Sequence, residues 1–403
     1  MTKPPIPRWK ARTLAAQALG IIEPTTKAVV PPVHVATTYE RDPDNSYRSG
    51  FVYGRADNAT VRQAEHVIAA MEGAQEALLF GSGVSAAAAV VMALPNPAHI
   101  VASEVMYWGF RNWLTCEATR LGHRVHFVDT SDPDALRRAT KPGDTALIWI
   151  ETPGNPLWTI SDIGGAAQIA HAAGALLAVD STVATPIFTQ PLSLGADFVM
   201  HSASKYLNGH SDVIAGAVAT ARSGPLWSKI AVIRAQYGMI LGPFEAWLLL
   251  RSLRTLDVRV RAQTESAALI ATWLRTHPSA AGVLYPGLPT HPGHAVAARQ
   301  MSGYGAMLSL RVKGGEKAAI AAAAGVNLWK RATSLGGVES LIEHRASVEG
   351  PDSCCPTDLL RLSVGLEVPE DLFADLDQAL RGAENHPNRG HRGSKVRPKR
   401  KAT

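Results

Sequence analysis

An aspartate and a lysine follow two apolar segments of this chain and carry complementary chemistry. Asp180 ends the apolar run 175–179, and Lys205 stands 25 positions later, just beyond the apolar run 198–201. If both runs are strands of one α/β sheet, their ends meet at the edge where such folds bind ligands. A lysine amine forms a Schiff base with an aldehyde, and a carboxylate keeps a pyridine nitrogen protonated so that the ring withdraws electrons. The pair therefore predicts a site for pyridoxal 5'-phosphate (PLP).

A glycine-rich segment, residues 80–86, precedes an alanine-rich run that predicts a helix. Glycines at a helix start let backbone N–H groups approach a phosphate, and the helix dipole favours an anion there. The segment also matches the dinucleotide fingerprint G-x-G-x-x-A, with Glu104 near the position of a ribose-binding acid. An NAD-dependent dehydrogenase is therefore an alternative prediction.

The elements that must position these residues follow an alternating pattern. Strands separated by helix-length segments predict a mostly parallel sheet covered on both faces. Helices are expected over residues 61–71 and 85–94, and strands over residues 99–103, 124–128, 146–151, 176–180, 198–201 and 213–219. Further along, the pattern predicts a helix over 256–277, a Pro/Gly loop over 285–293, a strand over 305–312, a helix over 317–324, and a strand over 359–364 before a closing helix.

These patterns divide the chain into four predicted regions. Residues 1–62, rich in proline, are expected to form an extended N-terminal arm. Residues 63–250 are expected to form a large PLP-binding domain, and residues 251–385 a smaller α+β domain. Residues 386–403 lack large apolar side chains and are expected to be a disordered basic tail.

The composition excludes several classes of protein. The chain has 403 residues, 46% of them apolar, without a signal-peptide pattern or a membrane-length apolar run, which predicts a cytoplasmic protein with no membrane contact. Three cysteines, Cys116, Cys354 and Cys355, cannot build a disulfide framework and are expected to be reduced. The net charge is +6, and seven basic residues with no acidic one lie from Arg389 onward. The rest of the chain therefore has a net charge of −1, which argues against a nucleic-acid partner.

Other polar clusters predict no site. His291 and His294 lie in a Pro/Gly loop without further ligands, so a surface turn is expected and no metal site is predicted. Cys116 falls in a helical stretch, where a buried small residue is expected rather than a nucleophile. For His201, a role beside the site and simple packing at a strand end both stay open.

An ordered set of motifs between residues 12 and 382 resembles the Cys/Met-metabolism, or trans-sulfuration, PLP enzymes. The most specific run is Ser-Ala-Ser-Lys-Tyr-Leu-Asn-Gly-His-Ser-Asp at residues 202–212. Further matches lie at residues 53–60, 81–83, 151–156, 252–256, 334–341 and 361–367. The resemblance implies the aspartate-aminotransferase type fold (fold type I), with a mostly parallel seven-stranded sheet in the large domain and a smaller α+β C-terminal domain.

The resemblance also implies a role for each matching residue. The implied cofactor contacts are Tyr53, Arg55, Gly83, Val84, Tyr107, Asp180, Ser202, Ser204 and Lys205. Lys205 would hold the aldehyde and shuttle protons, Asp180 would pair with the ring nitrogen, and Tyr107 would stack on the ring. Tyr53 and Arg55 would reach in from a neighbouring subunit, which implies a homotetramer built from two catalytic dimers. The aromatic residues Trp108 and Phe110 depart from the family pattern and are expected to reshape the substrate entrance.

The substrate implied is an amino acid. Arg361 resembles the family residue that grips the α-carboxylate in a bidentate pair, with Asn155 and Ser334 as further polar contacts. A guanidinium between Leu360 and Leu362 is costly to bury without an anionic partner, which favours a ligand role.

The expected reaction is carbon–sulfur chemistry in sulfur amino-acid metabolism. Family members that act at the γ-carbon typically carry a glutamate where this chain has Thr333. The missing charge favours a lyase of the cystathionine β-lyase kind, which yields homocysteine, pyruvate and ammonia. The alternative is a γ-acting enzyme: a cystathionine γ-synthase, a homoserine sulfhydrylase or a cystathionine γ-lyase.

Overall fold

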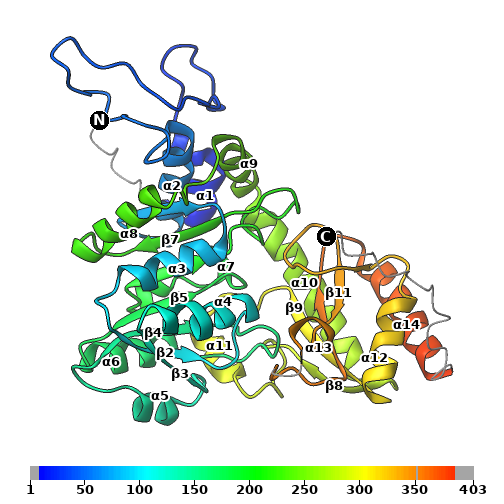
Figure 1. The fold of residues 1–403 in the computed structure, drawn as a ribbon. Coiled ribbons are helices and arrows are strands. Elements are labelled where there is room, and N and C mark those ends of the chain that lie inside the picture. Colours follow the sequence, from blue (N-terminus) through cyan, green and yellow to red (C-terminus); the bar gives the residue numbers. More distant parts are fainter. Residues whose placement is uncertain (1–8, 351–352, 386–403) are drawn as a thin grey trace, which may run out of the picture.

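Two β-sheets organise the chain in the computed structural model, which describes residues 9–350 and 353–385 (Figure 1). The larger is a seven-stranded sheet in the order β1-β7-β6-β5-β4-β2-β3, and the smaller is a five-stranded sheet in the order β10-β11-β12-β9-β8. Helices flank both sheets, which confirms the predicted α/β fold class with a large, mostly parallel sheet. The domain boundaries at residues 62, 250 and 385 stay predictions.

The large sheet collects the ends of its parallel strands at one edge. Its strands are β1 (Glu76–Phe80), β2 (His99–Ser103), β3 (Arg124–Val128), β4 (Thr145–Glu151), β5 (Leu176–Asp180), β6 (Phe198–His201) and β7 (Gly216–Thr220). The neighbours from β3 to β6 run parallel, whereas β7 runs antiparallel to β6 and β1. In this register Glu151 lies opposite Asp180, and His201 ends the next strand.

The strand predictions for the large sheet are confirmed to within one residue at each end, with two exceptions. The strand expected from residue 213 begins at Gly216, because the backbone N–H of Ala215 is instead bonded to the hydroxyl of Ser204 at 2.8 Å. Strand β1 was not predicted, since its short apolar run merges with the glycine-rich segment that follows it.

Helices cover both faces of the large sheet. They are α2 (Ala59–Glu72), α3 (Gly83–Ala93), α4 (Trp108–Trp113), η2 (Leu114–Ala118), α5 (Pro133–Ala139), α6 (Ile163–Ala172), α7 (Thr185–Phe188), η3 (Pro191–Leu194), α8 (Pro225–Gln236) and α9 (Pro243–Leu253). Side chains alternate along a strand. Leu147 and Trp149 of β4 therefore join the core under α3 and α8, while Ile148 and Ile150 join the core with α2 and α6.

The small sheet follows a long helix, α10 (Leu256–Leu274). Its elements are β8 (Ala280–Leu284), α11 (His294–Gln300), β9 (Met307–Val312), α12 (Gly315–Gly325), β10 (Lys330–Arg331), β11 (Leu341–His344), α13 (Ala346–Glu349), β12 (Leu359–Ser363) and α14 (Pro369–Asn385). Apart from the parallel pair β10–β11, its strands are antiparallel. None of the helices in the described ranges is both long enough and apolar enough to cross a membrane.

The N-terminal region is only partly the extended arm that was expected. It begins with α1 (Ala11–Gln17) and η1 (Ala18–Gly20), and the side chains of Leu14 and Ala15 are buried because the helix packs on the core. Residues 21–58 then form turns and extended segments. The predicted basic tail, residues 386–403, lies outside the described residues.

A buried ion pair fixes the chain where it enters α2. Arg234 of α8 contacts Glu65 of α2 at 2.5 Å, and their side chains are only 5% and 7% exposed. Arg234 also donates hydrogen bonds to the carbonyls of Leu79 and Ala56, each at 3.1 Å. One guanidinium thus joins two helices, a strand and the N-terminal segment.

Replacing Arg234 with methionine should lower the free energy of unfolding by about 3–5 kcal/mol, because Glu65 would stay buried without its partner. Urea unfolding measures the change. The matched control is Arg381→Met, which removes an exposed arginine paired with Asp377 and should cost no more than about 0.5 kcal/mol. Equal losses in the two variants would contradict the expectation.

Candidate active site

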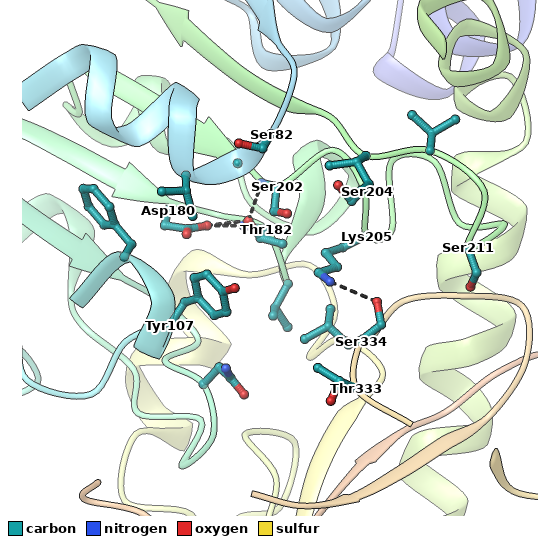
Figure 2. Close-up of a pocket in the computed structure, with 18 of the residues that line it drawn as sticks. Ser82, Tyr107, Asp180, Thr182, Ser202, Ser204, Lys205, Ser211, Thr333 and Ser334 are labelled. Atoms are coloured by element: carbon teal, nitrogen blue, oxygen red, sulfur yellow. Dashed lines mark hydrogen bonds between the residues drawn. The ribbon is translucent and has the colours of Figure 1, made fainter. Parts of the chain in front are cut away.

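A cavity of about 540 Å³ opens at the edge where the parallel strands end (Figure 2). The predicted site residues that line it are Gly83, Val84, Tyr107, Asn155, Asp180, Ser202, Ser204, Lys205 and Ser334. They come from the start of α3, the end of β5 and loops beside both sheets, so the cavity brings together residues far apart in sequence. Tyr53, Arg55 and Arg361, also predicted, do not line it.

The start of α3 forms one wall of the cavity. Ser82 caps the helix by accepting a hydrogen bond from the N–H of Ser85 at 3.0 Å, and the hydroxyl of Ser85 returns a bond to Ser82. The next N–H groups, of Gly83 and Val84, belong to the first turn, where no helical carbonyl is available. Gly83 is required here, because a Cβ atom would lie 2.9 Å from the Cβ of Ser202. The arrangement suits a bound anion.

Asp180 stands on the floor of the cavity, held in place by Thr182. One carboxylate oxygen, Oδ1, accepts from the N–H of Thr182 at 3.0 Å and from its hydroxyl at 2.5 Å. The hydroxyl oxygen of Thr182 in turn accepts from the N–H of Ser202 at 2.8 Å (Figure 2). Burial raises the pKa of Asp180. A cationic partner in the cavity would favour its ionised form.

Glu151 is a carboxylate in the cavity wall to which the sequence analysis gave no role. Its Oε2 accepts from the N–H of Tyr107 at 2.6 Å, and its Oε1 accepts from the N–H of Asn155 at 2.9 Å. One side chain therefore fixes the backbone at two predicted site residues. Burial, together with the nearby charge of Asp180, raises the pKa of Glu151 well above its usual value. The signal in the sequence was an acid at the end of an apolar strand, as at Asp180.

Lys205 points into the cavity from the loop after β6. Its Nζ donates a hydrogen bond to the hydroxyl of Ser334 at 2.9 Å (Figure 2). Burial, and then the positive charge of Arg361, lowers the pKa of Lys205 to about 8. A substantial share of the amine is therefore neutral at mildly alkaline pH, as a nucleophile or base requires.

Ser204 lines the cavity, and its implied phosphate contact stays a prediction. Its hydroxyl accepts from the N–H of Ala215 at 2.8 Å and donates to the carbonyl of the same residue at 3.1 Å. The side chain thus ties the lysine loop to the segment before β7, although it also lines the cavity.

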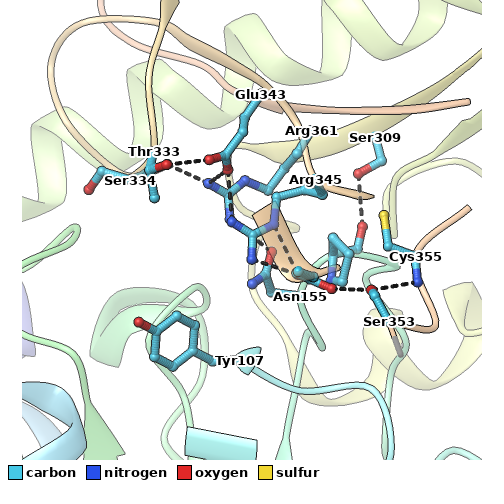
Figure 3. Close-up of polar contacts among 12 residues, drawn as sticks. Tyr107, Asn155, Ser309, Thr333, Ser334, Glu343, Arg345, Ser353, Cys355 and Arg361 are labelled. Atoms are coloured by element: carbon cyan, nitrogen blue, oxygen red, sulfur yellow. Dashed lines mark hydrogen bonds and ion pairs between the residues drawn. The ribbon is translucent and has the colours of Figure 1, made fainter. Parts of the chain in front are cut away.

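Arg361 lies behind Asn155 and Ser334, with 4% of its side chain exposed. Contrary to the prediction, the buried guanidinium does not require a ligand anion, because the protein supplies one: Nη2 contacts Glu343 at 2.6 Å (Figure 3). Arg345 pairs with the same Glu343 at 2.9 Å and with Glu349 at 2.5 Å. Two arginines and two glutamates thus form a balanced, buried network.

Tyr53 and Arg55 lie on the N-terminal segment, outside the cavity of their own chain. The ring of Tyr53 is exposed, and the guanidinium of Arg55 donates to the carbonyl of Ala235 at 2.7 Å. Their implied contribution to a neighbouring subunit stays a prediction.

The aromatic residues after Tyr107 separate in the structure. Phe110 lines the cavity and packs on the ring of Trp149, with centroids 4.7 Å apart. Trp108 is exposed and does not line the cavity. The expected reshaping of the substrate entrance stays a prediction.

Two predictions about residues away from the cavity are wrong. Cys116 is exposed, because Leu114 and Ala118 take the buried face of the π-helical turn η2. His291 is buried rather than at the surface, and its Nδ1 accepts from the N–H of Gly293 at 3.1 Å.

His201 is buried and lies 2.6 Å from Glu72, so it joins β6 to α2 and does not line the cavity. Across residues 9–350 and 353–385, no group of side chains suited to hold a metal ion is found.

The donor set of the cavity fits PLP. The first turn of α3 suits a phosphate, the buried carboxylate of Asp180 suits a protonated ring nitrogen, and the amine of Lys205 suits an aldehyde. Tyr107 offers an aromatic ring at the same cavity.

Comparisons with known proteins agree with this chemistry. The family model described as Cys/Met metabolism PLP-dependent enzyme matches residues 12–381. The cystathionine gamma-synthase of Mycobacterium tuberculosis (strain ATCC 25618 / H37Rv) is 42% identical over 364 residues, which cover 89% of this chain and 93% of that protein. The cystathionine gamma-lyase of Dictyostelium discoideum is 39% identical over 388 residues, covering 94% of this chain and 99% of that protein. The crystal structure of metB from Corynebacterium glutamicum aligns with a TM-score of 0.90 and 38% identity, covering 93% of this chain and 98% of that chain.

Proposed function

The chain belongs to the Cys/Met metabolism PLP-dependent enzymes, and from this premise we propose that it acts at the γ-carbon of an amino-acid substrate, as a cystathionine γ-synthase does. The observation that carries the proposal is the 42% identity to a cystathionine gamma-synthase across nearly its full length. A cystathionine γ-lyase activity is the second candidate, favoured by the relative from Dictyostelium discoideum. The NAD-dependent dehydrogenase is ruled out by the family.

The prediction of a cystathionine β-lyase receives no specific support, because the curated relatives compared above are named for γ-synthase and γ-lyase activities. It rested on Thr333 in place of a glutamate. The hydroxyl of Thr333 instead donates to Glu343, so a carboxylate lies directly behind Thr333, which lines the cavity. The γ-acting alternative therefore fits better than the β-lyase.

We propose the following residues as the ones that hold the cofactor. The N–H groups of Gly83 and Val84, with the hydroxyl of Ser202, would bind its phosphate, and Asp180 would pair with the ring nitrogen. Lys205 would bind the aldehyde carbon. When bound, PLP supplies an electron-withdrawing ring that makes the substrate's α-proton acidic.

The chain's own residues would then position the substrate and move its protons. Asn155 and Ser334 would contact the α-carboxylate region, with Arg361 behind them. The amine of Lys205, with its pKa lowered to about 8, would accept a proton from the α-carbon, release that proton, and as a neutral amine again accept a second proton from the β-carbon. The second transfer is what γ chemistry adds, since it allows a group on the γ-carbon to leave. Burial of the amine keeps bulk water from competing for these protons.

Product analysis tests the assignment. The purified holoenzyme is supplied with an O-acylated homoserine and cysteine, and separately with cystathionine. We expect cystathionine from the first mixture; cysteine with 2-oxobutyrate from the second would favour the γ-lyase. Homocysteine and pyruvate as the main products from cystathionine would overturn the proposal.

Capture of the cofactor should depend on pH through Lys205. The neutral amine attacks the aldehyde, and it predominates above the pKa of about 8. The rate at which the apoprotein gains its visible absorption band should therefore rise as pH increases through about 8 and level off above it. A rate that keeps rising toward about pH 10, as for an ordinary lysine, would contradict the lowered pKa.

We further propose that Tyr53 and Arg55 complete the site of a neighbouring subunit, in the predicted homotetramer. Arg55→Ala and Lys205→Ala chains, each inactive alone, should form mixed dimers with one complete site when co-expressed. Activity should then return to about a quarter of wild type, because half of randomly paired dimers are mixed. No return of activity, with mixed dimers isolated by two affinity tags, would place Arg55 in its own chain's site. The cytoplasmic location stays a prediction.

A further inference from the structure

The hydrogen bonds of Arg361 limit how it can bind a carboxylate. Its Nη1 donates to Oδ1 of Asn155 at 3.2 Å. Its Nη2 donates both to the carbonyl of Ser334 at 2.8 Å and to Oε2 of Glu343 at 2.6 Å (Figure 3). Nη2 has two hydrogens, so both are engaged.

A guanidinium offers a carboxylate two bidentate faces, one formed by Nη1 with Nη2 and one by Nε with Nη2. Nη2 belongs to both. Since Ser334 and Glu343 occupy it, neither face is free, and a substrate carboxylate must take over one of these two bonds. The carbonyl of Ser334 is fixed in the backbone, whereas Glu343 is a side chain of the same charge as the incoming group.

We propose that Glu343 is a built-in competitor for the substrate's α-carboxylate: it neutralises Arg361 in the free enzyme and yields its place on Nη2 when the substrate binds. The inference rests on the proposed amino-acid substrate and names a positioning residue for it.

The surroundings of Glu343 allow it to yield without becoming an isolated buried charge. Its Oε2 also accepts from Nη1 of Arg345 at 2.9 Å, and its Oε1 accepts from the hydroxyl of Thr333. Both bonds remain when the contact with Arg361 is lost. Arg345 is itself held by Glu349, with its Nε bonded to Oε1 at 3.0 Å. Arg345 is thus the second cation that makes the exchange possible.

The exchange makes opposite predictions for two variants. Glu343→Gln removes the competing charge with little change of shape, so a carboxylate should bind more tightly. Arg345→Gln removes the cation that receives Glu343, so Glu343 stays on Arg361 and a carboxylate should bind more weakly. A merely structural network would weaken binding in both.

The test uses the holoenzyme and two probes, L-alanine, which has a carboxylate and no leaving group, and L-alaninamide, which lacks the charge. Each is titrated while the visible absorption of the bound cofactor is followed. The preference for alanine over alaninamide should rise on the order of tenfold in Glu343→Gln and fall by a similar factor in Arg345→Gln.

Glu370→Gln is the control. It removes the charge of an exposed glutamate of α14 outside this network, and its preference should stay within about threefold of wild type. An unchanged or reduced preference in Glu343→Gln overturns the inference, as does an increased one in Arg345→Gln if Glu343→Gln does not fold. Failure of the proposed function looks different, because wild type would then form no γ-products whatever the binding preferences are.

Discussion

Lys205→Ala should turn over substrate at least about 10³-fold more slowly than wild type, because it removes both the amine that captures the aldehyde and the base that moves the protons. The visible absorption band of the covalently bound cofactor should disappear as well. Product formation under saturating substrate and the absorption spectrum measure the two effects.

The control for this variant is Lys229→Ala. Lys229 is a lysine of α8 whose Nζ donates to the carbonyl of Leu94 at 3.2 Å, outside the cavity. It should keep its spectrum and its activity within about twofold. If Lys205→Ala kept more than a tenth of wild-type turnover, the amine of Lys205 would have no part in the chemistry.

Asp180→Asn should lower kcat by about 10²–10³, because the neutral amide no longer stabilises a protonated ring nitrogen where charge develops. The amide oxygen can still accept from Thr182, so the loop keeps its shape and the cofactor stays bound. Single-turnover kinetics, which separate chemistry from binding, measure the effect.

An exposed aspartate at the other end of the sheet serves as the comparison. Asp144 precedes β4 and pairs with Arg124 at 2.5 Å, and Asp144→Asn should change kcat by less than about twofold. A weaker cofactor affinity with unchanged kcat in Asp180→Asn would mean that the carboxylate anchors the ring without tuning it.

The strand ends of the large sheet were predictable because short apolar runs alternate with helix-length segments. Strands β2, β3, β5 and β6 have the expected bounds, so the convergence of Asp180 and Lys205 on one cavity followed from the pattern alone. The glycine-rich start of α3 also followed from the residues themselves, and the family motifs added the loop around Ser334.

The polar network behind the cavity was not predictable in the same way. Glu343 meets Arg361 only because β11 and β12 pair antiparallel with these two residues opposite each other. The register between two strands joined by a loop cannot be predicted from the sequence of either strand alone. Glu343 follows only two apolar residues, Leu341 and Ile342, so its burial was not evident from the sequence. Glu151 was missed for a related reason, since its bonds run to backbone N–H groups, which carry no side-chain pattern.

The alignment of functional groups on the last residues of neighbouring parallel strands restricts how this protein can change in length. Glu151 and Asp180 end the adjacent strands β4 and β5 in register, and the loop that carries Ser202 and Lys205 starts directly after β6. Inserting or deleting one residue inside β5 would turn its final side chain to the opposite face and remove the acid from the cavity. Insertions and deletions should therefore be tolerated in the turns that precede the parallel strands, at the edge of the sheet away from the cavity. Libraries that vary loop length there should retain activity far more often than libraries that vary the strands.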